Sequence, residues 1–298
     1  MTTPLPVTVV GGYLGAGKTT LVNHLLRHAA GQRLAILVNE FGALPIDEDL
    51  IIAESDDLIS IAGGCICCTF GSDLSEAMIA LAAREPRPDH VVIESSGVAM
   101  PGAIGASLGL LAGFSLAGIV VLADSETVQR HADDEYLGDT TLRQLQDAHL
   151  IIQTKTDLVD AERADAVHGW LGEVNAAAAS VRAAHGRVPN AVVLGQHGTG
   201  VLASDAVHAD AAYESQVYAV TGARDPQGLA ASIATGGYGV IRGKGFVTDV
   251  HGNTQLVQTV GARARVEPYR GEVASEIVCI GLRGALDTAG LDALFAAD

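Results

Sequence analysis

Short apolar runs rich in β-branched residues recur along the first two thirds of the chain and predict buried strands. These runs cover residues 6–10, 34–38, 91–93, 118–123, 150–153 and 191–194. Between several of them, apolar residues recur at helical spacing, over residues 20–26, 74–84 and 161–184. Short apolar strands that alternate with helices indicate a parallel sheet covered by helices on both faces. We expect the functional side chains of such a sheet at the carboxyl ends of its strands.

The pattern changes near Gly200, where residues 202–212 are rich in Ala, Asp and His and read as a linker. Beyond it we expect strands at 217–220, 240–250, 254–266 and 275–282, and helices at 227–234 and 288–295. His251-Gly252-Asn253 is a hairpin turn signal. The sequence therefore predicts an α/β domain over residues 1–203 and a small α+β domain with an antiparallel sheet over residues 214–298.

Composition and charge limit the classes of binding partner that we expect. The chain has 298 residues, a formal net charge of −17 and a sequence pI of about 4.8. Lys and Arg are scattered without a basic block, so we expect no nucleic-acid partner. Residues 98–123 carry no charge, but Pro101 and several glycines interrupt them. A helix followed by a buried strand explains this stretch better than a membrane span. Met1 leads directly into the first strand without a signal peptide, which predicts a cytoplasmic protein.

The first predicted strand ends in a glycine-rich loop that reads G-x-x-x-x-G-K-T, from Gly12 to Thr19. A helix follows it, and strand, loop and helix together are the context of a phosphate-binding loop. Backbone N–H groups and the helix N-terminus attract a polyphosphate. Lys18 would reach the β- and γ-phosphates, and the Thr19 hydroxyl would ligate Mg²⁺. The loop predicts a protein that binds a nucleoside triphosphate.

Two further strand ends carry candidate residues. Glu94 ends an apolar run and is placed to orient Mg²⁺, because a carboxylate there needs a partner. Gly97 would let the following loop respond to the γ-phosphate. Residues 154–157 read T-K-T-D and resemble the guanine-recognition motif N-K-x-D. Asp157 would accept the two N–H groups of guanine, and the Lys155 stem would lie along the base. Thr154 lacks the paired donor and acceptor of Asn, so we expect a weaker tether.

Three of the four cysteines crowd into Cys65-Ile66-Cys67-Cys68. Three thiolates suit Zn²⁺, Co²⁺ or Cu⁺ and leave a fourth position, which Glu40, a water or a histidine would fill. An incomplete ligand set suits a transferable ion better than a structural one. Buried small side chains or a redox pair remain alternatives. Cys279 lies in an apolar strand and is expected in the core.

Taken in order, five motifs resemble the CobW-type metal-chaperone P-loop GTPases. They are G-Y-L-G-A-G-K-T-T, N-E-F-G, G-G-C-I-C-C, E-S-S-G and T-K-T-D. R-G-K-G-F at 242–246 and S-E-I-V-C-I-G at 275–281 resemble the second domain of that family. The resemblance therefore extends over nearly the whole chain, and the cysteine motif is its distinguishing mark.

The resemblance implies a Mg²⁺-dependent GTPase that binds Zn²⁺ or Co²⁺ and delivers it to a client metalloprotein. By motif it assigns the phosphate loop to residues 12–20, including Gly12, Leu14, Gly15, Ala16, Gly17, Lys18, Thr19 and Thr20. It assigns the metal site to Cys65, Cys67 and Cys68 with Glu40 nearby, and the base contacts to Lys155 and Asp157.

Three departures from the family pattern qualify these expectations. Ala43 stands where the family often has an acidic residue, and His208-Ala209-Asp210 replaces a long histidine-rich stretch. Thr154 in place of Asn leaves GTP preferred but more weakly bound. An activator of one metalloenzyme and a nucleotide-responsive zinc sensor with little turnover remain alternatives. The metal, the client and the oligomeric state, a homodimer included, stay open.

Overall fold

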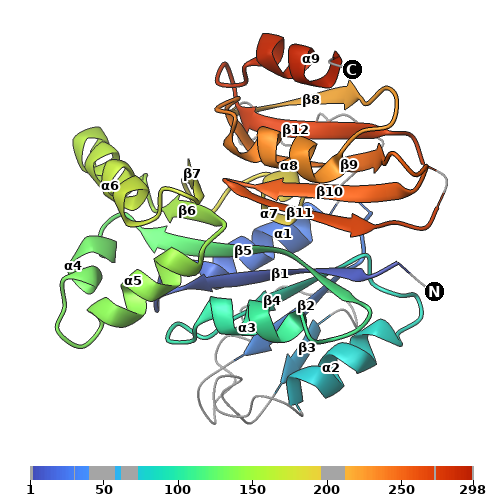
Figure 1. Ribbon diagram of the computed structural model, residues 1–298. Helices are drawn as coiled ribbons and strands as arrows, with labels where there is room; N and C mark the ends of the chain where they lie inside the picture. Colours follow the sequence, from blue (N-terminus) through green and yellow to red (C-terminus); the bar gives the residue numbers. More distant parts are fainter. Residues whose placement is uncertain are drawn as a thin grey trace. The chain divides into compact units, whose positions relative to one another are not determined.

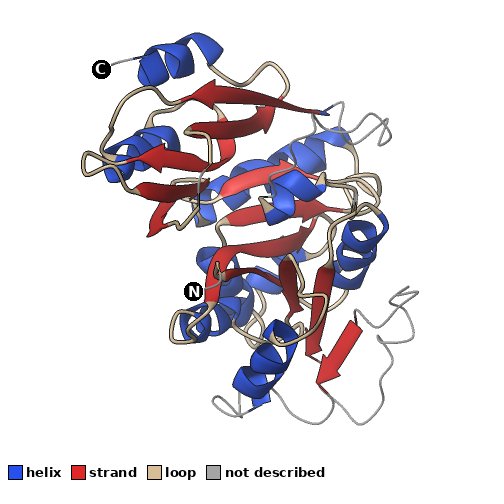
Figure 2. Ribbon diagram, turned by 90° about the vertical axis from the view of Figure 1, so that its right-hand side faces the viewer, coloured by secondary structure: helices blue, strands red, loops and turns tan. Residues whose placement is uncertain are grey.

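The computed structural model describes residues 3–29, 31–39, 58–61, 73–195, 212–271 and 273–296. The chain divides into two compact units. The first unit is Met1–Ala176 with Ser180–Arg187, and the second is Ala177–Ala179 with Val188–Asp298. The predicted boundary between 203 and 214 falls mostly outside the described residues, so the two domains with these limits stay a prediction. Figure 1 labels the elements, and Figure 2 distinguishes helices from strands by colour.

The first sheet has seven strands in the order β3-β2-β4-β1-β5-β6-β7. They are β1 (Leu5–Gly12), β2 (Leu34–Asn39), β3 (Leu58–Ile61), β4 (His90–Glu94), β5 (Phe114–Asp124), β6 (Leu150–Thr154) and β7 (Ala179–Arg182). The pairings from β3 to β6 are all parallel. All five residues of β4 and of β6 are buried, as expected for strands covered on both faces.

The helices of the first unit connect these strands. They are α1 (Lys18–Arg27), α2 (Asp73–Ala82), α3 (Pro101–Leu108), α4 (Val128–Ala132), α5 (Gly138–Asp147) and α6 (Ala161–Val174). The connection from β1 to β2 runs along the sheet in one direction, and that from β4 to β5 in the other. Right-handed crossovers therefore place α1 on one face and α3 on the other, as Figure 1 shows. This confirms the predicted parallel sheet with helices on both faces.

One predicted element of the first unit is wrong, and one stretch without a prediction forms helices. The helix predicted over 161–184 ends at Val174, because the following Asn175 leaves the helical conformation. The Asn175 amide instead donates to the carbonyls of Leu145, Gln146 and Ala148, at 2.8, 3.2 and 3.2 Å. Residues 179–182 then form β7. The chain between residues 124 and 150, which carried no assignment from the pattern, forms α4 and α5.

The strand predicted at 191–194 is the short helix α7 (Asn190–Leu194), which belongs to the second unit. Pro189 precedes it and Gly195, in the left-handed conformation at φ 64°, ends it. The buried Arg242 donates from Nη1 to the carbonyls of Val192 and Val193, at 3.3 and 3.0 Å. A guanidinium on the last carbonyls of a helix favours the helix over a strand.

The second unit contains a five-stranded antiparallel sheet in the order β11-β10-β9-β12-β8. Its strands are β8 (Tyr213–Ala219), β9 (Val240–Thr248), β10 (Thr254–Val260), β11 (Arg263–Pro268) and β12 (Glu276–Leu282). The helices α8 (Pro226–Thr235) and α9 (Thr288–Ala296) contribute Leu229, Ile233, Leu291 and Phe295 to its core. This confirms the predicted α+β unit, and Cys279 is fully buried in it as expected.

The hairpin predicted around residues 251–253 joins β9 to β10. The Asp249 carboxylate accepts the backbone N–H groups of His251 and Asn253, at 2.9 and 2.8 Å. The bond from Asn253 is the main reason that the pKa of Asp249 falls to about 2. The single strand predicted over 254–266 is wrong, since a turn at Gly261, with φ 55°, divides it into β10 and β11.

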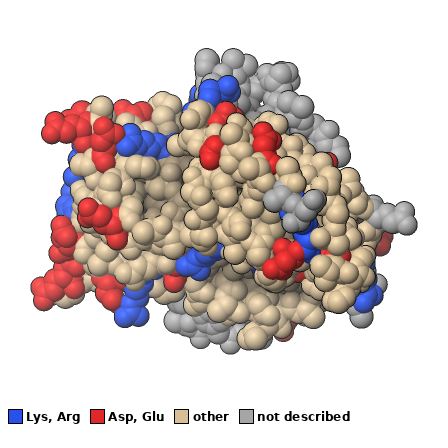
Figure 3. Space-filling view, turned by 45° about the horizontal axis from the view of Figure 1, so that its top comes forward, with Lys and Arg blue, Asp and Glu red and all other residues tan. Residues whose placement is uncertain are grey.

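Helix length and surface charge bear on the predictions made for a membrane and for nucleic acid. Among the described residues, no helix is both long and apolar enough to span a membrane. On the face shown in Figure 3, the Lys and Arg side chains stand in small groups among Asp and Glu. The described atoms of that face form no broad basic surface of the kind that binds a nucleic-acid backbone.

Candidate functional site

The candidate site lies at the carboxyl ends of four neighbouring strands of the first sheet. β4, β1, β5 and β6 are consecutive in the sheet, and their parallel pairing brings their carboxyl ends to one edge. Val10 of β1 pairs with Glu94 of β4, and Asp124 of β5 pairs with Thr154 of β6. The topology thus brings the phosphate-loop residues, Glu94 and the T-K-T-D motif together, as predicted for a sheet of this kind.

Glycines give the phosphate loop its shape. Gly12, Gly15 and Gly17 have φ values of 133°, 76° and 98°, a region that other residues rarely adopt. A Cβ on Gly12 would lie 2.6 Å from the carbonyl oxygen of Leu122 in β5. Gly17 is the N-cap of α1, and no side chain caps the helix there. The helix N-terminus therefore offers its first N–H groups to an anion.

Lys18 is the first residue of α1, and its side chain folds back over the loop. Its ammonium group donates to the carbonyl oxygens of Gly12 and Tyr13, at 2.9 and 3.2 Å. The side chain is 8% exposed. A buried ammonium held on backbone carbonyls at the mouth of this loop is suited to contact phosphate oxygens.

Thr19 and Glu94 form the next contact of the site. The Thr19 hydroxyl donates to Oε1 of Glu94 at 3.0 Å, although the two residues are 75 positions apart. Glu94 is 4% exposed at the end of β4. Mg²⁺ prefers a few oxygen ligands and keeps several waters. A hydroxyl and a buried carboxylate side by side fit Mg²⁺ bound by Thr19, with Glu94 acting through its water shell.

The loop after β4 packs against the phosphate loop. Gly97 is buried, and a Cβ there would lie 2.8 Å from the backbone nitrogen of Leu14. The hydroxyl oxygens of Ser95 and Ser96 are buried and have no hydrogen-bond partner within the described part of the chain. Buried hydroxyls usually have partners, so these two are candidates to contact a ligand. The sequence shows that Ser95 and Ser96 belong to the E-S-S-G motif, but it does not show that their hydroxyl groups are buried.

Thr154 makes its contact with the phosphate loop through its hydroxyl. Its hydroxyl is buried and donates to the carbonyl oxygen of Ala16 at 2.9 Å. This bond ties the carboxyl end of β6 directly to the phosphate loop, 138 residues away in sequence. The hydroxyl thus supplies a tether to the phosphate loop, and the weaker tether and weaker guanine binding expected from Thr in place of Asn stay predictions.

Lys155 continues from β6 in a left-handed conformation, with φ 56°. Its ammonium group pairs with Oδ2 of Asp124 at 2.7 Å. Asp124 is nearly buried at the end of β5, and its other oxygen accepts the backbone N–H of Glu126 at 2.9 Å. The ion pair fixes the end of the Lys155 side chain, which leaves its methylene stem to lie along a base.

Asp157 lies at the surface beside His185. Its carboxylate accepts the backbone N–H of His185 at 3.1 Å, and Nδ1 of the same histidine lies 3.1 Å from Oδ2. The backbone hydrogen bond holds the pKa of Asp157 below its usual range, so the group is an anionic acceptor at neutral pH. His185 was missed because 161–184 was predicted as one helix. The signal available was His185-Gly186, a turn sequence that follows Ala183-Ala184.

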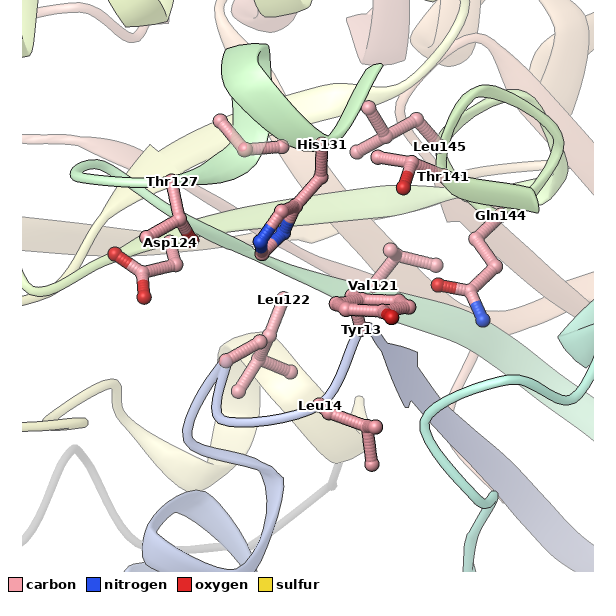
Figure 4. Close-up of a pocket in the computed structure, with 12 residues that line it drawn as sticks. Tyr13, Leu14, Val121, Leu122, Asp124, Thr127, His131, Thr141, Gln144 and Leu145 are labelled. Atoms are coloured by element: carbon pink, nitrogen blue, oxygen red, sulfur yellow. The ribbon is translucent and has the colours of Figure 1, made fainter. Parts of the chain in front are cut away.

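A small hollow adjoins the phosphate loop (Figure 4). Its volume is about 10 Å³, room for about one water molecule. The ring of Tyr13 lies against that of His131 from α4, with centroids 4.7 Å apart. Thr141 and Gln144 of α5 form the opposite wall. The hollow thus lies between the phosphate loop and two helices, α4 and α5, that the sequence pattern did not predict.

The predicted metal ligands Cys65, Cys67, Cys68 and Glu40 lie outside the described residues. Their assignment as a metal site therefore stays a prediction. Within the described ranges, no group of three or more His, Cys, Asp and Glu side chains is placed to hold a metal ion.

Comparisons with known proteins identify the relatives of the chain. A family model, the CobW/HypB/UreG nucleotide-binding domain, matches residues 6–182. The zinc chaperone CobW of Sinorhizobium sp is 34% identical over 87% of this chain and 86% of its own length. The zinc chaperone YjiA of Escherichia coli is 32% identical over 65% of this chain and 62% of its own length. A Zn(II)-bound crystal structure of the E. coli YjiA GTPase covers 99% of both chains at 23% identity and a TM-score of 0.47. The chain therefore belongs to the CobW/HypB/UreG family.

Proposed function

We propose that the protein is a Mg²⁺-dependent GTPase that couples GTP binding and hydrolysis to the delivery of a transition metal, Zn²⁺ or Co²⁺, to a client metalloprotein. The contact between Thr19 and Glu94, together with the Lys18 ammonium group on the phosphate loop, carries this proposal. It assembles the groups for a metal–triphosphate complex at the end of the sheet. Relatives named zinc chaperone and zinc-regulated GTPase metalloprotein activator support the metal and the client.

At the phosphate end of the site, different described residues bind the phosphates and the Mg²⁺ ion. The glycine loop and the N-terminus of α1 bind the phosphates, and Lys18 moves from two carbonyls to phosphate oxygens. Thr19 and Glu94 would hold Mg²⁺, which neutralises charge that develops during phosphoryl transfer. The described side chains that we place at this end include no arginine. We therefore expect slow hydrolysis without a partner or metal.

Guanine selectivity rests on Asp157. A carboxylate accepts from N1–H and the C2 amino group of guanine together, whereas adenine offers neither donor there. The anionic state of Asp157 is favoured by His185, and the Thr154 tether keeps this loop at a fixed distance from the phosphate loop. A single nucleotide can therefore contact both ends of the site.

The transported metal would bind the cysteine motif at 65–68, which lies in sequence between the phosphate loop and Glu94. Residues 39–47 and 94–97 flank this motif along the chain, and we propose that the triphosphate orders residues 39–47 and contacts residues 94–97. Nucleotide state then makes or opens the metal site. A thiolate set that lacks one ligand releases an ion more readily than a complete one.

Phosphate release from GTP and from ATP, each with Mg²⁺, tests the enzymatic part of this proposal. We expect GTP hydrolysis that a stoichiometric amount of Zn²⁺ or Co²⁺ changes, and little ATP hydrolysis. Replacement of all three motif cysteines by serine should abolish the metal effect and retain basal hydrolysis. Absence of GTP hydrolysis under every metal condition would contradict the GTPase assignment and favour a nucleotide-binding zinc sensor.

A further inference from the structure

Helix α5 carries an unusual buried stripe. Its buried residues are Gly138, Thr141, Gln144 and Leu145, so two polar side chains occupy positions where a core helix normally carries apolar ones. Gln144 is 1% exposed and Thr141 is 3% exposed. The Thr141 hydroxyl has no hydrogen-bond partner among the described residues. Buried amides are costly unless their donors are used, which raises the question of what Gln144 binds.

Gln144 uses both amide donors on the loop that follows Glu94. Its Nε2 donates to the carbonyl oxygen of Gly97 at 3.0 Å and to that of Ala99 at 2.8 Å. Three residues further along α5, Asp147 accepts the backbone N–H of Gly102 at 2.8 Å. One helix therefore holds both the loop after β4 and the first turn of α3.

The held loop is the one in contact with the phosphate loop. Gly97 lies so close to Leu14 that a Cβ would come within 2.6–2.8 Å of its Cδ2, Cγ and backbone nitrogen. Glycine is also the residue whose peptide units reorient most easily. Without bonds on its carbonyl, the peptide between Gly97 and Val98 would sample several orientations. The bond from Gln144 to the Gly97 carbonyl selects one of them, and its second bond holds the Ala99 carbonyl two residues further on.

We propose that Gln144 is a positioning residue for the triphosphate state: it fixes the Gly97 peptide so that the loop meets a γ-phosphate already ordered. This inference rests on the proposed function, because it takes a nucleoside triphosphate as the ligand. Preorganisation lowers the conformational entropy that binding would otherwise remove. This gain in binding free energy applies to GTP, whose γ-phosphate reaches this loop, and not to GDP.

The same bonds give α5 a connection to the hollow beside the phosphate loop. Thr141 and Gln144 both line it, opposite Tyr13 and His131 (Figure 4). A displacement of α5 would therefore act on the loop through the contacts of Gln144 with the Gly97 and Ala99 carbonyls, and on Tyr13 through the hollow. Both changes reach residues that we place next to the phosphates.

The test compares Gln144→Met with Gln146→Met in the full chain. Met has nearly the length of Gln but no donor, and Gln146 is an exposed residue two positions further on the same helix. Equilibrium binding of GDP and of a non-hydrolysable imido analogue of GTP is measured with Mg²⁺. For Gln144→Met we expect roughly tenfold weaker binding of the analogue, the size of two lost hydrogen bonds, with GDP binding within about twofold of the parent. Gln146→Met should match the parent for both nucleotides.

An unchanged ratio of analogue to GDP affinity in Gln144→Met would overturn the positioning role, whether both affinities fall together or neither falls. If Gln144→Met does not fold, hydrogen exchange of the parent protein decides instead. A preordered loop predicts slow exchange of the amides of residues 97–99 with GDP and only a small further change with the analogue. Fast exchange with GDP would overturn the inference. Failure of the parent protein to bind either nucleotide would instead refute the proposed function.

Discussion

At the scale of single residues, Lys18 contributes most to the proposed nucleotide chemistry. Its ammonium group is buried and bonded to two loop carbonyls, an arrangement that keeps a cation at the place where phosphates would bind. We expect Lys18→Ala to weaken binding of a GTP analogue by about 10- to 100-fold, the effect of one charged hydrogen bond, and to abolish hydrolysis. Isothermal titration and phosphate release measure the two effects.

Arg143→Ala is a suitable control for that variant. Arg143 is an exposed cation that pairs with Asp139 one turn away on α5, at 2.9 Å. Its loss should leave nucleotide binding and turnover unchanged. Turnover by Lys18→Ala at the parent rate would contradict the assignment of residues 12–19 as the phosphate loop.

Asp157 permits a prediction in which selectivity changes rather than disappears. In Asp157→Asn, an amide N–H₂ replaces one of the two acceptor oxygens. Xanthine has a carbonyl where guanine has its C2 amino group, so the amide can donate to it. We expect roughly 10- to 100-fold weaker GTP binding and stronger XTP binding, measured by competition with a fluorescent nucleotide. Equal losses for GTP and XTP would show that Asp157 does not contact the base edge.

At the scale of elements, the Thr154 hydroxyl joins β6 to the phosphate loop. Thr154→Val keeps the shape of the side chain but leaves the carbonyl of Ala16 without this donor. We expect the free energy of unfolding to fall by about 1–3 kcal/mol and nucleotide affinity to fall with it. Urea unfolding measures the first effect and titration with a GTP analogue the second.

Thr235→Val provides the matched comparison. Thr235 also donates its hydroxyl to a carbonyl at 2.9 Å, that of Ala231, but on the exposed face of α8. Its replacement should change the unfolding free energy by only a few tenths of a kcal/mol, roughly the spread seen for surface substitutions. Equal effects of the two substitutions would remove the special role of the bond at Ala16.

The elements also show how far the sequence predicts the structure. The β-branched runs of β1, β4 and β6 are continuous and fully buried, so local pattern and tertiary environment agree there. Residues 191–194 have the same composition yet form α7, because a distant guanidinium, that of Arg242, binds the carbonyls at its end. A contact made 50 residues away leaves no trace in a local pattern.

In the site, too, residues that belong to sequence motifs were predicted, and residues that act through long-range contacts were not. Lys18, Thr19 and Glu94 belong to motifs whose spacing is set by the ligand, and the structure brings them together. His185 and Gln144 act through tertiary contacts with Asp157 and Gly97. Neither has a motif of its own, and α5 carries polar residues in its buried stripe, which obscures its apolar period. Such supporting residues emerge only from the fold.

At the scale of the whole molecule, the central claim is that nucleotide and metal bind to one coupled system. If the triphosphate orders residues 39–47, which precede the cysteine motif in the chain, the free energy of metal binding must depend on nucleotide state. Thermodynamic linkage then requires that the metal change nucleotide affinity by the same factor. A coupling of about 1–3 kcal/mol, typical of allosteric proteins, corresponds to roughly 5- to 150-fold.

The most direct test is a titration of the Mg²⁺-loaded protein with a non-hydrolysable GTP analogue, in the absence of transition metal and with one equivalent of Zn²⁺ or Co²⁺. The account predicts a several-fold change in analogue affinity, matched by an equal change in metal affinity when the order of addition is reversed. It also predicts that serine at positions 65, 67 and 68 removes the change. Identical analogue affinities with and without metal would contradict the coupling between GTP and the transported ion.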